Sequence, residues 1–186
     1  SVSTHGRYVA FSSGASNLVQ GDTNGAGDVF VRDRKLGTTE RVSVTARGKQ
    51  PKGSSYGPAI TGDGRFVVFM SESADLVPGD TNDQLDIFLR DRKLGTIERV
   101  SVTAGGKQAN SGSFIAQGNR VVTLDGRFVA FESYASNLVP GDTNGTRDVF
   151  VRDRGTGTTE RVSVSSGDAQ GNEESAEPVI SGGGGG

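Results

Sequence analysis

One phrase of 17 residues occurs three times in this chain and restricts its possible folds more than any other feature. It reads LVQGDTNGAGDVFVRDR at 18–34, LVPGDTNDQLDIFLRDR at 76–92 and LVPGDTNGTRDVFVRDR at 138–154. The surrounding residues repeat as well, because the 39-residue stretches 6–44 and 126–164 are identical at 31 positions. The aligned glycines Gly6, Gly64 and Gly126 are 58 and 62 residues apart. Self-similarity at a fixed period of this length indicates a repeat architecture.

Each repeat has the pattern of four short strands. Runs such as RYVAF, DVFVRD and ERVSV have no helical period and are rich in Val, Phe and Thr, while Gly, Asn, Asp and Ser occupy the joints. A further run precedes each aligned glycine, at 57–64, 120–126 and 176–182. The joints are short, and the Asp-Gly pairs before Arg65 and Arg127 favour tight antiparallel hairpins. Since YVAF and VFV do not alternate cleanly, we expect both faces of these strands to be covered.

Four-stranded antiparallel units that pack on their neighbours describe the blades of a β-propeller. We therefore expect an all-β chain of three four-stranded repeats, at about 1–58, 59–120 and 121–181. These form a single propeller domain over 1–181, followed by a glycine tail at 182–186. The four extra residues of the longer period fall between Val102 and Gly126, and we interpret them as a loop insertion.

The segments PAITGDGRFVVFMS and DIFLRDRKLG in the second repeat resemble the repeat of TolB-like (PD40/WD40-like) propellers. In such propellers the first strand of each blade lies nearest the central axis. The loop between the second and third strands opens on one rim. The resemblance therefore implies that all three GDTN phrases lie on a single rim, and it also suggests protein partners in the cell envelope.

Three blades are too few for a typical closed ring, because closed propellers usually have four to eight blades. The stretch before Gly6 retains only the end of a first strand, whereas ESAEPVIS at 174–181 is a complete copy of that strand. Two arrangements follow. Two copies of the chain could exchange this strand and form a six-bladed homodimer, or the chain could be part of a longer six- or seven-bladed protein.

The GDTN phrase carries oxygen ligands at alternate positions of a glycine-containing loop, a pattern that suits Ca²⁺. The candidate metal ligands are Asp22, Asn24 and Asp28 with their copies Asp80, Asn82, Asp86, Asp142, Asn144 and Asp148. The third carboxylate of a familiar calcium loop is replaced by Ala26, Gln84 and Thr146. The same residues also suit a structural function, in which Asp and Asn form an Asx turn and the last Asp accepts backbone N–H bonds.

Other charged residues have structural interpretations. The RDR triplet at 32–34 and its copies could clamp an anion, but pairing across adjacent strands and blades fits a strand end better. Glu40 and Arg41 are interpreted as charges that keep an outer edge strand from pairing with another chain. His5 takes the place of the turn Asp. One histidine and no Gly-x-Ser-x-Gly motif leave little from which to build a catalytic triad, so no catalytic residues are expected.

Charge and composition exclude several classes of partner. With 20 Lys and Arg interleaved with 22 Asp and Glu, no broad basic face is expected, so nucleic acid is not an expected partner. No apolar run approaches the roughly 18 residues of a membrane helix, so membrane insertion is not expected. The absence of cysteine excludes disulfides and thiolate chemistry.

The resulting hypothesis is a non-enzymatic propeller from a secreted or periplasmic bacterial protein, acting as a scaffold or binding module for a protein partner, with Ca²⁺ as a candidate stabilising ion. Two alternatives remain: a substrate-gating propeller of a larger serine peptidase, and a repeat lectin. One equivalent position early in the long loop, occupied by Gly14, Glu72 and Tyr134, differs in all three repeats, and specificity for a ligand could reside there.

Overall fold

The computed structural model describes residues 1–116 and 120–181, and every regular element in these ranges is a β-strand. Within this part of the chain no helix is long and apolar enough to cross a membrane. The strands are β1 (Tyr8–Ser13), β2 (Asp28–Asp33), β3 (Thr38–Arg41), β4 (Ser55–Ile60), β5 (Phe66–Ser71), β6 (Asp86–Asp91), β7 (Thr96–Arg99), β8 (Ser113–Phe114), β9 (Phe128–Ser133), β10 (Asp148–Asp153) and β11 (Thr158–Arg161).

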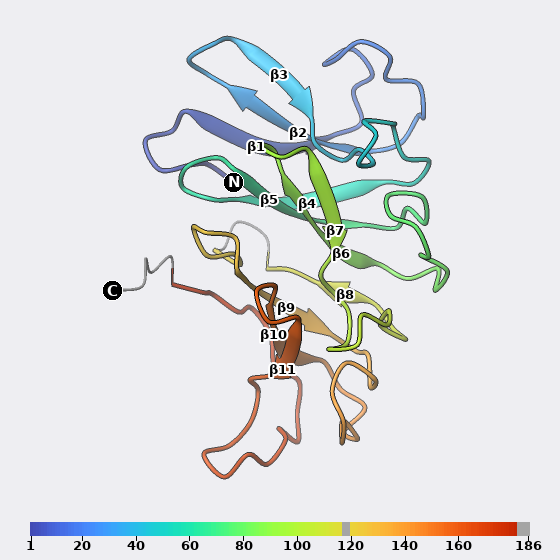
Figure 1. Ribbon diagram of the computed structural model, residues 1–186, viewed down its shortest axis with the longest axis vertical. Coiled ribbons are helices and arrows are strands. Elements are labelled where there is room, and N and C mark those ends of the chain that lie inside the picture. Colours follow the sequence, from blue (N-terminus) through green and yellow to red (C-terminus); the bar gives the residue numbers. More distant parts are fainter. Residues whose placement is uncertain (117–119, 182–186) are drawn as a thin grey trace.

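The strands form three antiparallel sheets that follow one another along the molecule (Figure 1). Blade 1 contains β1, β2 and β3 as its second to fourth strands, and the bridge between Val2 and Val9 adds the end of its first strand. Blade 2 contains β4 to β7, and blade 3 contains β8 to β11, each in the order of the sequence. This confirms the predicted all-β fold of propeller blades.

The strand register follows the repeat. In blade 1, Phe11 of β1 is opposite Phe30 of β2, and the equivalent phenylalanines face each other in the other two blades. The rings of each pair stack, with centroids 5.8 Å apart in blade 1, 6.0 Å in blade 2 and 5.7 Å in blade 3. A one-residue slip would turn every such side chain to the opposite face, so these pairs specify the register.

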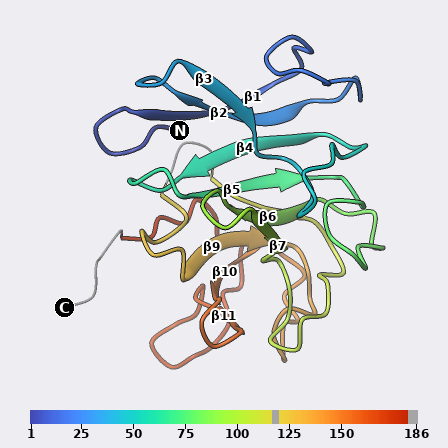
Figure 2. The same cartoon turned by 45° about the horizontal axis from the view of Figure 1, so that its top comes forward.

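The hydrophobic core lies between the blades. One apolar cluster joins the face of blade 1 that carries Ala10 and Val31 to Val67 and Phe69 of blade 2. A second cluster joins blade 2 to blade 3. All six residues of β5 are buried because blade 2 is covered on both sides, as the uneven alternation predicted (Figure 2).

The first strand of blade 3 differs from the prediction. In blade 2 only Gly57 and Pro58 separate the two paired halves of β4, where the ladder has an irregularity. In blade 3 the two halves are β8 and the bridge at Val122, which are separated in sequence by residues 115–121. The paired positions Phe114 and Val122 are therefore four residues further apart in sequence than their copies Tyr56 and Ile60 in blade 2.

Candidate functional site

The GDTN loops follow the second strand of each blade and contact the linker that leads into the next blade. In blade 1, the Asn24 side-chain amide donates to the carbonyl of Pro51 at 3.0 Å, and the Thr23 backbone N–H donates to Oε1 of Gln50 at 3.3 Å. Asn82 and Asn144 donate in the same way to the carbonyls of Ala109 and Gly171. Each copy therefore holds the segment that follows the last strand of its own blade.

The aspartate that begins the third strand of each blade is fully buried and accepts several hydrogen bonds. Asp28 accepts bonds from the hydroxyl of Ser43 at 2.7 Å, from the amide of Asn24 at 3.2 Å and from Arg41 at 3.1 Å. Asp86 and Asp148 make equivalent bonds. These bonds offset the cost of taking a carboxylate out of water.

The guanidinium of Arg41 lies between the two carboxylates of its phrase, with Nη1 3.2 Å from Asp22 and 3.1 Å from Asp28. Arg99 bridges Asp80 and Asp86, and Arg161 bridges Asp142 and Asp148. The interpretation of Arg41 as a charge on an outer edge is therefore wrong. Its side chain is only 9% exposed because it reaches across the sheet from the end of β3.

Burial raises the pKa of Asp80 and of Asp142 above its usual range, and the opposing attraction of Arg99 or Arg161 does not fully cancel this. The space between the two carboxylates of each pair is thus occupied by an arginine guanidinium of the chain itself. Among the residues described, no group of three or more His, Asp or Glu side chains could hold a metal ion. Calcium binding by the nine residues of the GDTN phrases stays a prediction, tested below.

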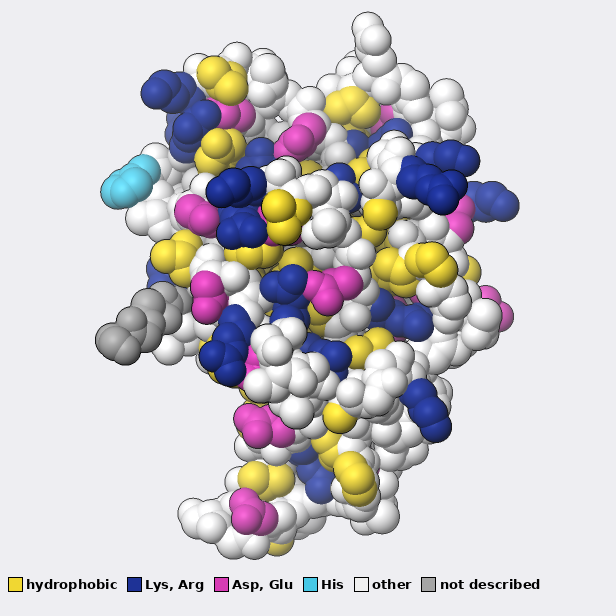
Figure 3. All heavy atoms as spheres, in the orientation of Figure 1, with side chains coloured by type: hydrophobic (Ala, Val, Ile, Leu, Met, Phe, Trp, Pro, Cys, Tyr) yellow, Lys and Arg dark blue, Asp and Glu magenta, His cyan; other side chains and the backbone are white. Residues whose placement is uncertain are grey.

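The RDR triplets make ion pairs within and between blades, in agreement with the structural interpretation. Asp33 pairs with Arg7 at 2.8 Å, from the turn that precedes β1. Arg92 of blade 2 pairs with Glu40 of blade 1, and Arg154 of blade 3 pairs with Glu98 of blade 2. Basic and acidic side chains are accordingly interspersed over the face seen in Figure 3.

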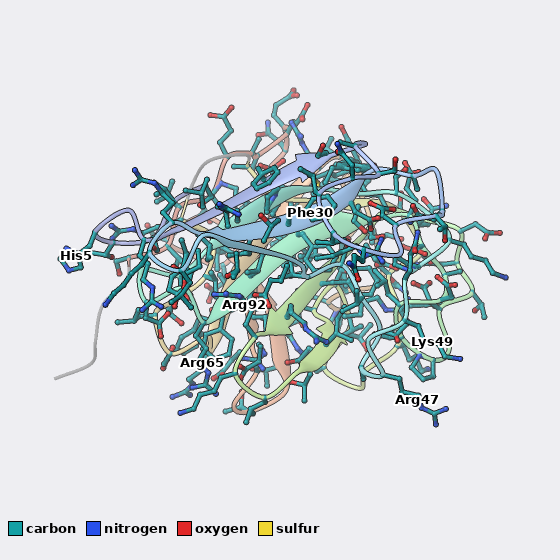
Figure 4. All side chains as sticks on the ribbon, turned by 90° about the horizontal axis from the view of Figure 1, so that it is seen from above. His5, Phe30, Arg47, Lys49, Arg65 and Arg92 are labelled. Carbon is teal, nitrogen blue, oxygen red and sulfur yellow. The ribbon has the colours of Figure 1, made fainter. Side chains whose placement is uncertain are left out.

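His5 projects into solvent from a turn at one edge of the molecule (Figure 4). Its φ of 67° is in the left-handed region, which agrees with its interpretation as a polar turn residue. The loop that carries Arg47 and Lys49 projects from another edge, whereas Phe30 lies among the strands (Figure 4).

The first strands of the three blades line a common pocket of about 220 Å³. Its walls come from residues 1–4, 59–62 and 120–124, and they include the hydroxyl side chains of Ser1, Thr4 and Thr61 and the charged Arg120. The pocket lies where these three strands converge, which agrees with the expectation that the first strand lies nearest the axis.

The position that directly follows the second strand of each blade differs in all three repeats. Glu72 accepts a hydrogen bond from the hydroxyl of Tyr56 at 2.9 Å, and burial together with this carboxylate raises the pKa of Tyr56 to about 12. In blade 3 the equivalent positions are Tyr134 and Phe114, whose rings meet edge to face with centroids 6.0 Å apart. Blade 1 has only Gly14 at this place.

Arg147 adds a charged group beside these aromatic rings. It lies 5.9 Å from the centroid of Tyr134 and pairs with the buried Glu132 at 2.8 Å and with Glu174. We define the rim patch as Tyr56, Glu72, Phe114, Tyr134 and Arg147. Tyr56 and Phe114 belong to adjacent blades and pack against the same core cluster. Comparing the repeats at positions 14, 72 and 134 identifies Glu72 and Tyr134 from the sequence. The contact of Arg147 with Tyr134 is evident only in the structure.

Comparisons with known proteins bear on the fold. No protein-family model matches the chain, and no curated protein matches it in sequence. A TolB-type protein from Agrobacterium tumefaciens has a TM-score of 0.52 and 18% identity over 86% of this chain and 46% of its own length. TolB from Acinetobacter baumannii has a TM-score of 0.48 and 18% identity over 90% of this chain and 32% of its own.

The tricorn protease matches with a TM-score of 0.47 and 14% identity, over 82% of this chain and 13% of its own length. The chain thus spans less than half the length of each of these structures. Identities this low bear on the fold alone. Together with the three sheets described above, the match to the Agrobacterium protein shows that the chain has a β-propeller blade fold similar to that of the TolB-type protein.

Proposed function

We propose that this chain is a non-enzymatic β-propeller module that binds a protein partner through the rim patch. The observation that carries the proposal is the position of the differences among repeats. The repeated charges fasten the blades to one another, whereas the rim patch departs from the repeat and places aromatic rings beside a guanidinium. Tyrosine and arginine are the residues that most often dominate the binding energy of protein interfaces.

Exposure supports the same assignment. Tyr134 is 46% exposed although its partner ring Phe114 and Arg147 hold it in place. A preordered aromatic side chain loses little conformational entropy on binding. The resemblance to TolB propellers underlies the proposals that the partner is a protein of the cell envelope and that the module works in the periplasm or outside the cell.

Site-specific photo-crosslinking tests the proposal. We would place p-benzoylphenylalanine at position 134, or at the control position of Leu36, which is 66% exposed on the turn between β2 and β3. Each protein is irradiated in an envelope extract of the source bacterium. We expect an adduct of discrete mass from position 134 alone.

Competition makes the experiment specific. Excess unlabelled wild type should suppress the adduct, and excess of a Tyr134→Ala, Phe114→Ala variant should not. The absence of an adduct, or the same adducts from both positions, would refute binding at the rim patch.

Calcium is the second part of the proposal, and a melting curve in excess CaCl₂ against EDTA tests it. Binding to the folded state at 100 times the Kd would add about 2.7 kcal/mol to the free energy of unfolding. A cation held by Asp80, Asn82 and Asp86 would have to displace Arg99. An Arg99→Gln variant should therefore respond more strongly than wild type. If neither protein shifts at millimolar calcium, the GDTN phrases bind no calcium.

A further inference from the structure

We propose that two copies of this chain assemble into a closed six-bladed ring, with blade 3 of each copy packed on blade 1 of the other. The argument starts from the two interfaces within the chain, which are copies of one interface. In the first, Ala10, Val31 and Val42 of blade 1 pack against Val67 and Phe69 of blade 2. In the second, the equivalent Val68, Leu89 and Val100 of blade 2 pack against Val129 and Phe131 of blade 3.

Blade 3 presents the same apolar face, and no blade of the described chain covers it. Val162 is 44% exposed, whereas its copies Val42 and Val100 are 2% and 1% exposed. Val164 is 36% exposed, and Val102 is 7% exposed at the equivalent position. In both internal interfaces, the equivalent surface is covered by the following blade.

Blade 1 presents the complementary face. Val9, Phe11 and Leu18 are only partly buried. Their copies in blade 2, led by Phe69 at 0% and Leu76 at 2%, are covered by the face of blade 1. Since blades 1 and 3 are so similar in sequence, blade 1 of a second copy carries the side chains that fit the exposed face of blade 3.

Charges at the two open faces are complementary in the same way. Each internal interface has one ion pair between a glutamate of the earlier blade and an arginine of the later blade, Glu40 with Arg92 and Glu98 with Arg154. The third glutamate of this series, Glu160, is exposed on blade 3, and the third arginine, Arg34, is exposed on blade 1. In the proposed ring they form the missing pair.

The C-terminal segment already lies on blade 3 as a first strand of a further blade would. The Ser175 N–H donates to the carbonyl of Arg147, as Ser55 donates to Gly27 and Ser113 to Leu85. The Glu177 N–H donates to Glu132, at the place where Gly57 donates to Ser12 in blade 1.

Blade 1 has an edge that this segment fits. In blade 2, Ser55 and Tyr56 pair with Ser71 and Met70. In the described part of blade 1 no strand pairs with the equivalent Ser13 and Ser12 on this edge. Residues 175–178 of one copy and residues 1–3 of the other would together supply the complete first strand. Six blades lie within the range that closes a propeller, and the exchange removes both open edges.

Light scattering over a dilution series tests the ring, which requires a species of twice 19.3 kDa. Charge reversal then identifies the faces. Arg34→Glu and Glu160→Arg should each weaken the dimer at least tenfold, because each variant alone opposes like charges in both interfaces. An equimolar mixture of the two variants should dimerise again, since both interfaces of the mixed dimer then pair opposite charges. Lys35→Glu, next to Arg34, should leave the dimer intact.

Three outcomes would overturn the proposal. They are a folded monomer at every concentration, masses that grow with concentration as in an open head-to-tail chain, and failure of the mixed variants to associate. A folded monomer would instead assign the open faces to further blades of a longer protein. Circular dichroism of each variant distinguishes loss of association from loss of folding.

Discussion

Gly64 lies against blade 1 at a position where the absence of a side chain is required. Its φ is 78°, and a Cβ at this position would overlap the ring of Tyr8 from the preceding blade. We expect Gly64→Ala to lower the free energy of unfolding by about 2–4 kcal/mol, since it adds left-handed strain to a steric clash. Urea denaturation measures the change.

A matched control exists in the same blade. Gly79 has a φ of 76° but nothing within 4 Å of the added Cβ. Gly79→Ala should therefore cost only the conformational penalty, about 1 kcal/mol. Equal losses for the two variants would show that the contact with Tyr8 contributes nothing.

Asp33 makes stability depend on pH. Its hydrogen bonds from Arg7 and from the backbone lower the pKa of this carboxyl from 3.8 to about 2. A carboxylate with a lowered pKa contributes stability that is fully present above its unfolded pKa and is lost as pH falls through its folded pKa. Asp33→Asn should therefore be less stable than wild type at pH 6, and the difference should vanish as pH falls toward about 2.

Urea titrations at pH 6, 4 and 2.5 measure this dependence. In an Arg7→Gln background the effect of Asp33→Asn should vary less with pH, because the main cause of the shift is gone. A difference between wild type and Asp33→Asn that stayed constant from pH 6 to 2.5 would contradict the assignment of this ion pair.

At the scale of elements, Arg99 fastens β7 to the GDTN loop of its own blade. Its guanidinium is 2.8 Å from Asp80 and 3.0 Å from the fully buried Asp86. Arg99→Met would leave two carboxylates without their cation, which typically costs about 3–5 kcal/mol. Thermal unfolding should show this loss, while Arg47→Met, at an exposed loop residue, should change stability by less than about 0.5 kcal/mol.

Most elements could be predicted from the sequence because the repeat presents the same strand pattern three times. The pairing of Phe114 and Val122 in one first strand could not, since four more residues separate them than separate the equivalent Tyr56 and Ile60. The binding partners of Arg41 were also missed. Its side chain alternates with the exposed Glu40 along β3 and reaches Asp28, 13 residues away, a contact that only the folded sheet creates.

At the scale of the whole molecule, the main strand contacts between blades join neighbouring blades, so stability should vary along the chain as in other repeat proteins. Blade 2 has both faces covered, whereas blades 1 and 3 each have one open face. Equivalent amides in the third strands, those of Val31, Leu89 and Val151, allow a direct comparison. At high dilution we expect the Leu89 amide to exchange at least tenfold more slowly than the other two, a difference of about 1.4 kcal/mol in local opening.

Hydrogen exchange followed by NMR at several protein concentrations measures these three amides. If two copies cover each other's open faces, protection of Val31 and Val151 should rise with concentration toward that of Leu89. Equal protection of all three amides at high dilution would mean that the blades unfold as one cooperative unit. In that case the open faces would cost the end blades no local stability, and the nearest-neighbour description of this chain would be wrong.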